Sequence, residues 1–209
     1  MDIRILNTKN RIQEGLIASM REIPLYRLKD KDVIEKSEIS SSSFYKYYSD
    51  KNEVLDDIEA ELLKEYRTAL NNDARQLRTL QFPPNKKDIR LFVDKNTTEI
   101  VEYFSEKKST LAVLTSDKGD PGFTSELIEM TAQVVKLLME HYFKLYGQED
   151  ILKQKKFKLL MLSKWYAFCF VGPLLFWLEH SDEMAIRDAK ELILSMILKS
   201  PYDVSTHGF

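Results

Sequence analysis

The chain has 209 residues, a formal net charge of −2, and only six glycines and six prolines. A chain of this length forms one or two compact domains with a full-sized core. Because glycine and proline are scarce and helical periodicity dominates, we predict an all-α protein. A single cysteine excludes an internal disulfide framework. No secretory signal opens the sequence, so we expect a cytoplasmic location.

The first predicted helix spans residues 8–21, with Thr8 as its N-terminal cap. Its apolar face repeats every four residues, at Ile12, Leu16 and Met20. Gly15 stands in the middle of this helix, where glycine costs about 1 kcal/mol relative to alanine. A close crossing with another helix would explain a glycine at this position.

Two shorter helices follow the first. We predict the first of these two helices over residues 30–37, with Asp30 as its cap. Glu38 and Ile39 form the expected turn, and the next helix begins near Ser40. Two short helices joined by a turn of a few residues are typical of a helix-turn-helix motif.

The helix that begins near Ser40 has two different faces. Phe44 and Tyr48 lie four residues apart and share the inward face with Ile39. The outward face carries hydroxyls, phenols and a cation: Ser41, Ser42, Ser43, Tyr45, Lys46 and Tyr47. Such groups bind phosphates and reach base edges in the major groove. Lys51, at the start of the next helix, is unfavourable beside the positive end of a helix dipole unless an anion lies nearby. A serine-rich loop beside a core aromatic pair is the simpler alternative.

This part of the chain resembles the DNA-binding signature of TetR-family regulators. The matching segments are residues 33–34, 37–40, 43–48 and 51–55. Glu38 stands where glycine is usual in that signature, so the turn either avoids a left-handed backbone conformation or is slightly strained. Ser43 replaces the usual threonine, and Lys29 stands where serine or threonine commonly caps the second helix.

The resemblance implies a domain organisation, a partner and a set of contacts. It implies an N-terminal three-helix DNA-binding domain in residues 1–50, and a larger helical effector and dimerisation domain in residues 51–209. It also implies a ligand-responsive repressor that binds a double-stranded DNA operator, an inverted repeat, as a homodimer. The expected DNA contacts are Lys31, Ser41, Ser42, Ser43, Tyr45, Lys46, Tyr47 and Lys51.

The remainder of the chain continues with helical periodicity. Asp50 or Ser49 is expected to cap the first helix of this part, and Gly147 is expected to end another. Residues 82–85 and 116–122 are predicted loops, because proline and glycine gather there. We predict helices over residues 51–78, 88–107, 108–115, 123–146 and 151–179, and a last helix capped by Ser181, Asp182 and Glu183.

The predicted helix 151–179 is apolar on all sides from Trp165 onward, which predicts burial on all sides. Its longest uncharged run, residues 165–178, is shorter than the roughly 20 residues that a membrane span needs, so we expect no membrane contact. This helix is either the centre of one domain or partly faces another subunit. The resemblance favours a dimer held by residues 157–198, with Ile193 as an example of an interface position.

The large rings around residues 165–177 also predict an apolar pocket for a small hydrophobic or aromatic effector. The candidate lining residues come from several predicted helices: Leu62, Tyr66, Phe104, Met130, Val134, Trp165, Tyr166, Phe168 and Phe176. The alternative is that these rings only fill the core and the dimer interface.

The sequence contains no catalytic site or metal site that we would assign. The three histidines are too scattered for a helical metal pair, and Cys169 lies in an apolar run that is typical of an inert, buried thiol. No glycine-rich phosphate loop is present. We therefore expect neither an enzyme nor a bound cofactor. The alternative function is a co-activator or adaptor whose helical domain binds a partner protein instead of a small molecule.

Overall fold

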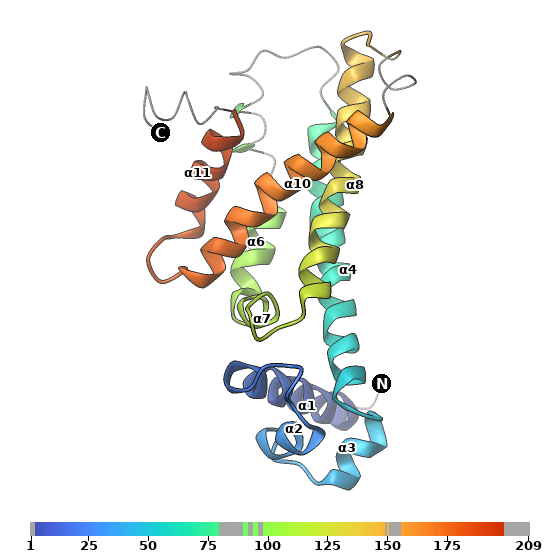
Figure 1. The fold of residues 1–209 in the computed structure, drawn as a ribbon, viewed down its shortest axis with the longest axis vertical. Coiled ribbons are helices and arrows are strands. Elements are labelled where there is room, and N and C mark those ends of the chain that lie inside the picture. The colour runs from blue at the N-terminus through green and yellow to red at the C-terminus, as the bar shows by residue number, and fades with distance from the viewer. Residues whose placement is uncertain are drawn as a thin grey trace. The chain divides into compact units, whose positions relative to one another are not determined.

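A computed structural model describes residues 3–79, 90–91, 94–95, 98–148, 150 and 156–198. Every regular element in these residues is a helix (Figure 1), which confirms the predicted all-α class. The chain divides into two compact units. Unit 1 comprises Met1–Lys64 and Ser109–Thr124, and unit 2 comprises Glu65–Lys108 and Ser125–Phe209. The predicted loop at residues 82–85 lies outside the described residues.

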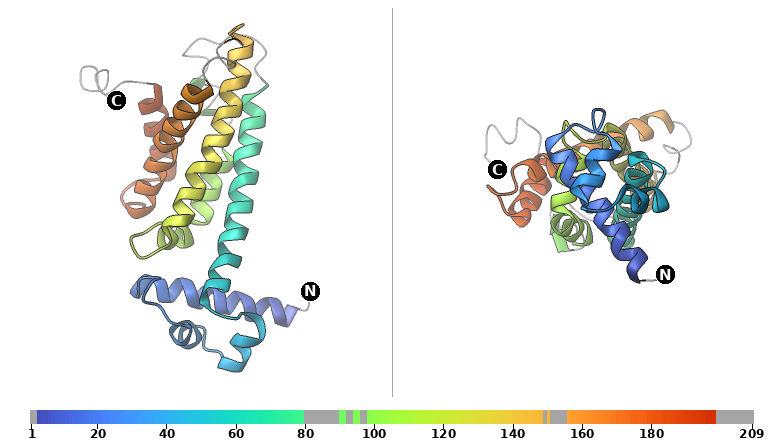
Figure 2. Two further views of the ribbon diagram at one scale, coloured as in Figure 1. Left: turned by 45° about the vertical axis from the view of Figure 1, so that its right-hand side comes forward. Right: turned by 90° about the horizontal axis from the view of Figure 1, so that it is seen from below.

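Unit 1 contains the first three helices and the beginning of a fourth. The helices are α1 (Ile3–Glu22), α2 (Asp30–Lys36), α3 (Ser41–Tyr47) and α4 (Lys51–Leu77), of which the last continues into unit 2. α2 packs on both α1 and α3 (Figure 2). Apolar side chains from all four helices form the core of this unit: Ile12, Leu16, Met20, Val33, Phe44, Val54 and Leu55.

α1 is longer than predicted, because it begins at Ile3. Thr8, the predicted cap, lies inside the helix, and its hydroxyl donates to the Arg4 carbonyl at 2.9 Å. The predicted cap is therefore wrong. A threonine hydroxyl can bond to the carbonyl four residues earlier within a helix, so a threonine alone does not mark a helix start.

Gly15 marks a very close approach between α1 and the end of α2. A Cβ atom added at Gly15 would lie 2.0 Å from Ser37 Oγ, 2.8 Å from the Ser37 nitrogen and 2.9 Å from its Cα. One turn later, the buried Ser19 hydroxyl donates to the Gly15 carbonyl at 2.8 Å. The helix crossing that the glycine predicted is confirmed.

Lys29, and not Asp30, is the residue that caps α2. Its backbone N–H donates to the Asp32 carboxylate at 2.9 Å, an arrangement that satisfies one end of a capping box. The prediction that Asp30 caps this helix is wrong. Asp32 supplies the acceptor, so the Asp30 carboxylate is available to donors from other helices.

A corner between α7 (Lys108–Leu114) and α8 (Pro121–Leu145) belongs to unit 1. The Lys118 carbonyl accepts the Leu25 N–H at 2.9 Å, and the Lys118 ammonium donates to the Arg21 carbonyl at 2.8 Å. The Arg21 guanidinium also donates to the Ser109 hydroxyl at 2.6 Å. These contacts hold the corner against the C-terminal end of α1 and the chain that follows it.

A buried aromatic cluster lies within unit 2. Tyr66 of α4 lies with its ring centroid 5.5 Å from that of Tyr103 and 6.1 Å from that of Phe104, both of α6 (Glu99–Glu106). The Tyr66 hydroxyl lies 2.5 Å from the Thr131 hydroxyl of α8. Thr131 donates its own proton to the Leu127 carbonyl at 2.8 Å, so Tyr66 is the donor to Thr131. The buried phenol is thus satisfied.

Asp73 of α4 holds the first turn of α6. Its carboxylate accepts the backbone N–H groups of Glu99 at 3.2 Å and Ile100 at 3.1 Å. Burial raises the pKa of this carboxyl above its ordinary value. The continuous helix predicted over residues 88–107 is wrong at Thr98, which is not helical, and part of that segment lies outside the described residues. α6 begins after Thr98 because Asp73 supplies the acceptors that its first N–H groups need.

α8 begins two residues earlier than predicted, at Pro121, where the missing N–H of proline is not needed. The helix ends at Leu145, and Gly147, with a φ of +63°, stops it two residues later, as predicted. Two backbone hydrogen bonds close a Schellman motif there: Gln148 N–H to Phe143 O at 2.8 Å and Gly147 N–H to Lys144 O at 3.0 Å.

The last two helices pack on each other. α10 (Lys156–Glu179) and α11 (Ile186–Leu198) lie side by side, and α11 also packs on α6 (Figure 1). The predicted cap at residues 181–183 is wrong, because those residues form a turn. Trp177 Nε1 donates to the Met184 carbonyl at 2.8 Å and holds that turn in place. Ile193 is 4% exposed within the single chain, so it is a core residue and not a surface position.

The prediction that α10 is buried on all sides is also wrong for the single chain. We call five of its exposed side chains the α10 stripe: Phe157, Met161, Trp165, Phe168 and Phe176. They are between 54% and 78% exposed and recur at spacings of three, four or eight residues, which places them on one side of the helix. A helix that is apolar all round gives no sequence signal for which side lacks a partner in its own chain.

We predict that Gly15→Ala lowers the free energy of unfolding of unit 1 by about 1–3 kcal/mol, because the new methyl group would force the Ser37 backbone to move. Asn10→Ala is the control, since Asn10 is exposed on the same helix. It should change stability by less than about 0.7 kcal/mol. Urea unfolding followed by circular dichroism measures both. Equal stability of the two variants would contradict the close crossing.

Candidate nucleic-acid interface

α3 buries one face and exposes the other, as predicted. Phe44 is fully buried and Tyr48 is 2% exposed. Tyr45 is 55% exposed, and the remaining predicted contacts on this helix are exposed or half-buried: Ser41, Ser42, Ser43, Lys46 and Tyr47. The Phe44 ring packs edge-on against Tyr45, with centroids 5.2 Å apart, and so supports the outward ring from below. A rigid aromatic ring beside a cation is therefore displayed at the surface.

Ser40 caps α3 and organises the serine run. Its hydroxyl accepts the Ser43 N–H at 3.1 Å and lies 3.0 Å from the hydroxyls of both Ser42 and Ser43. The four consecutive serines therefore start a helix and do not form a loop. Ser42 and Ser43 hold their hydroxyls near the first turn of the helix, and Ser41 is exposed beside them.

The turn before α3 is a Schellman motif with glutamate in place of glycine. Glu38 has a φ of +52°, in the left-handed region. Ile39 N–H bonds to Ile34 O at 3.5 Å, and Glu38 N–H bonds to Glu35 O at 3.1 Å. Arg11 donates to the carbonyls of Ser37 and Glu38 at 3.1 and 3.0 Å. The sequence left open whether this turn avoids a left-handed backbone or is slightly strained. The structure shows the strained, left-handed conformation at Glu38.

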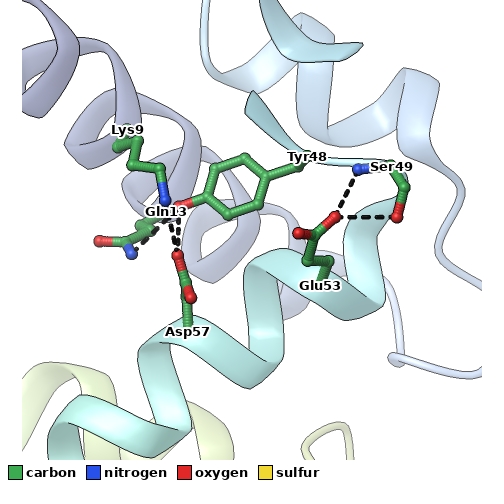
Figure 3. Close-up of polar contacts among 6 residues, drawn as sticks. All are labelled: Lys9, Gln13, Tyr48, Ser49, Glu53 and Asp57. Carbon is green, nitrogen blue, oxygen red and sulfur yellow. Dashed lines mark hydrogen bonds and ion pairs between the residues drawn. The ribbon is translucent and has the colours of Figure 1, made fainter. Parts of the chain in front are cut away.

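A polar network joins α3 to α1 and α4 (Figure 3). The Tyr48 hydroxyl donates to Asp57 of α4 at 3.0 Å, and Lys9 of α1 pairs with the same carboxylate at 3.0 Å. Lys9 also lies 4.7 Å from the centre of the Tyr48 ring, and Gln13 donates to the Tyr48 hydroxyl at 3.4 Å. Burial, and then the hydrogen bond to Asp57, raise the pKa of Tyr48, so the phenol stays protonated.

The start of α4 is capped by Asp50, one of the two caps expected. Its carboxylate accepts the N–H groups of Asn52 at 2.8 Å and Glu53 at 3.0 Å. Glu53 in turn accepts the Ser49 N–H at 2.6 Å and the Ser49 hydroxyl at 2.8 Å (Figure 3). These hydrogen bonds lower the pKa of both carboxyls. The largest effect on Asp50 comes from the Glu53 backbone N–H, and the largest effect on Glu53 comes from the Ser49 backbone N–H. The link between α3 and α4 is thus fixed.

Asp30 brings three helices together at the exposed side of unit 1. Its Oδ1 accepts the Lys51 N–H of α4 at 2.9 Å, and its Oδ2 accepts the Tyr45 hydroxyl of α3 at 3.4 Å. Lys29 and Lys31 flank Asp30 in the sequence. Lys31, Tyr45 and Lys51, three of the predicted contacts, therefore lie around one junction. The anion expected near Lys51 is present within the chain itself.

The cations of unit 1 fall into two groups. Lys9, Arg11 and Lys36 are paired with carboxylates of their own chain. Within residues 27–51, around α2 and α3, five cations form no such pair with the described residues: Arg27, Lys29, Lys31, Lys46 and Lys51. Arg21 and Lys118 also form no ion pair in the described part of the chain, but they donate instead to the Ser109 hydroxyl and to the Arg21 carbonyl. We did not predict Arg27 and Lys29 from the sequence, although their alternation with Lys31 was visible there.

No protein-family model and no curated protein matches the chain. Among solved structures, it is similar to the crystal structure of a TetR transcriptional regulator from Streptococcus agalactiae 2603V, with a TM-score of 0.54. The sequences are 21% identical, and the match covers 94% of this chain and 96% of that chain. The chain has the TetR fold. An N-terminal helix-turn-helix followed by a larger helical part is therefore shown, and α2 and α3 are the two helices of that motif in the TetR fold.

The residues predicted to line an effector pocket do not share one environment. Tyr66, Phe104 and Met130 are buried in unit 2, and Leu62 is buried in unit 1. Val134 and Tyr166 are half-buried, whereas Trp165, Phe168 and Phe176 are exposed and belong to the α10 stripe. Exposed rings cannot enclose a ligand within one chain. The effector pocket stays a prediction, and its best-supported members are the buried residues of unit 2.

We predict that Glu38→Gly raises the free energy of unfolding by about 1 kcal/mol, because glycine adopts a left-handed backbone without the Cβ penalty. Glu38→Ala removes the same carboxylate but keeps a Cβ, so it should give no gain. Thermal unfolding of the three proteins measures the difference. A gain in Glu38→Ala as large as that in Glu38→Gly would show that the side chain, and not the backbone, limits stability.

Proposed function

We propose that the chain is a transcription regulator of the TetR type that reads double-stranded DNA with α3. The observation that carries this proposal is the exposed surface of the helix-turn-helix. It combines serine hydroxyls, Tyr45 and five cations that no carboxylate of the described chain neutralises in an ion pair. Phosphate contacts from such cations supply affinity and position, and side chains of a helix in the major groove supply specificity.

We further propose that two copies of the chain bind the operator as a homodimer, through the α10 stripe. A row of large exposed apolar side chains marks a surface that a partner covers. By length and composition alone, α10 is the one helix in the described residues that could cross a membrane. Its three lysines and its packing on α11 favour a protein partner instead. A second copy is the occupant we favour, because α3 has seven residues and a two-fold dimer doubles the DNA that is read.

Repression that is relieved by a small apolar effector is the mode of regulation we propose. A ligand can shift DNA affinity only if it binds one conformation better than another. The buried cluster of Tyr66, Phe104 and Thr131 supports a site in unit 2, since it joins α4, α6 and α8, and Met130 is buried next to Thr131 in the sequence. α4 leads from this cluster back to the helix-turn-helix. Binding that displaces α4 would therefore reach the reader through one continuous helix.

The second candidate function is an adaptor whose α10 stripe binds a different protein. The same exposed rings that favour a dimer favour this alternative. The oligomeric state of the purified chain separates the two, because an adaptor with an unoccupied stripe would stay monomeric at concentrations where a homodimer forms.

We predict that Tyr45→Ala and Lys46→Ala each weaken binding to a duplex selected from a random pool by roughly tenfold, because each loses an outward contact of α3. Lys46→Ala should also reduce the slope of log affinity against log salt by about one counterion. Lys136→Ala is the control, because Lys136 lies on α8 and pairs with Glu140. Fluorescence anisotropy over a salt series measures all three. Unchanged affinity in both α3 variants would contradict the assigned reader helix.

We predict that Phe168→Glu converts a dimer into monomers, because it would bury an unpaired charge at the proposed interface. The dissociation constant should rise by at least roughly 30-fold, which corresponds to about 2 kcal/mol. The fold should survive, since Phe168 is 56% exposed in the single chain. Tyr26→Glu is the control, because Tyr26 is 76% exposed in unit 1. Sedimentation velocity measures both, and a wild-type monomer at micromolar concentration would contradict the dimer.

A further inference from the structure

The Asp30 carboxylate accepts hydrogen bonds from two donors at the surface that we propose binds DNA. The first is the Lys51 N–H, which opens α4 and lies 2.9 Å from Oδ1. The second is the Tyr45 hydroxyl, 3.4 Å from Oδ2. Desolvation and then the charge of Asp30 raise the pKa of Tyr45, so this phenol remains a donor. Both donors are of the kind that protein–DNA complexes direct at phosphates.

Asp30 lies among cations, both in the sequence and beside its hydrogen-bond partners. Four cations adjoin Asp30 or its hydrogen-bond partners: Lys29 and Lys31, on either side in the sequence, Lys51, whose N–H it accepts, and Lys46, next to Tyr45. None of these four pairs with a carboxylate in the described part of the chain. Asp30 is also not required as a cap for its own helix, because Asp32 supplies that acceptor. Its carboxylate instead accepts hydrogen bonds from α3 and α4.

We propose that Asp30 sets the affinity of the reader surface by acting as an internal substitute for a DNA phosphate. This inference rests on the proposed function. In the free chain the carboxylate holds the Tyr45 hydroxyl and the Lys51 N–H in place and offsets part of the local positive charge. When DNA arrives, a backbone phosphate must compete with Asp30 for these donors and is repelled by its charge. Binding is therefore weaker than the five cations alone would give, and it depends more on base contacts.

The test is the pair of neutral variants Asp30→Asn and Asp30→Ser. Both keep an oxygen that can accept the Lys51 N–H, and both remove the charge. We expect affinity for the selected duplex and for a random duplex to rise by roughly threefold to tenfold at 50 mM salt. The gain should shrink as salt rises, because screening weakens the repulsion. Thermal unfolding checks that each variant is folded, and the second variant serves if the first is not.

Glu61→Gln is the matched control for net charge. Glu61 is exposed on α4, ten residues beyond Lys51 and thus about 15 Å further along the helix. An equal gain in Glu61→Gln and Asp30→Asn would overturn the specific role of Asp30, and so would weaker binding by both Asp30 variants. DNA binding that falls in Lys46→Ala but does not rise in the Asp30 variants would overturn this inference alone. Absence of DNA binding by the wild-type chain would overturn the proposed function as well.

Discussion

The contact between Tyr48 and Asp57 is the interaction on which the proposed DNA-reading surface depends. It fixes the C-terminal end of α3 to α4, and Lys9 ties the same carboxylate to α1. Once Phe44 and Tyr48 face inward, the helical repeat leaves the side chains between them facing outward. The direction of Tyr45 and Lys46 is therefore a consequence of what the opposite face buries. The Tyr48 ring is buried, whereas the Lys9 and Asp57 side chains are 31% and 45% exposed, so the ion pair alone contributes little.

The sequence predicted well wherever one local pattern had one structural solution. The spacing of Phe44 and Tyr48 predicted the buried face of α3, and Gly15 predicted a close crossing. Prediction failed where several residues could satisfy the same group. Thr8, Asp30 and Ser181 all had the chemistry of a cap, but α1 and α11 begin at other residues, and Lys29 holds the cap position of α2. The uniform apolarity of α10 failed for another reason, because burial by a neighbouring helix and burial by a partner require the same residue types.

Unit 2 shows how buried polar groups can select one packing arrangement. Asp73 supplies acceptors to the start of α6, and Tyr66 donates to Thr131 on α8. Asp73, Tyr66 and Thr131 each have a partner on a different helix, so sliding one helix by a turn would leave a donor or acceptor unsatisfied. Apolar contacts alone would tolerate several arrangements of α4, α6 and α8. These few polar contacts specify one, and no pattern in the sequence pairs residues 73 and 99 in advance.

Because the corner around Lys118 belongs to unit 1, this unit is built from two separate stretches of the chain, which are synthesised at different times. A ribosome releases α1, α2 and α3 long before it adds the residues that accept the Leu25 N–H and bind the Arg21 carbonyl. The end of α1 and the chain that follows it therefore make these contacts only after a segment 97 residues beyond Arg21 has been added. Closing so long a loop is slower than forming local helical contacts. The contacts within unit 1 are thus completed only after roughly half of the polypeptide has been made.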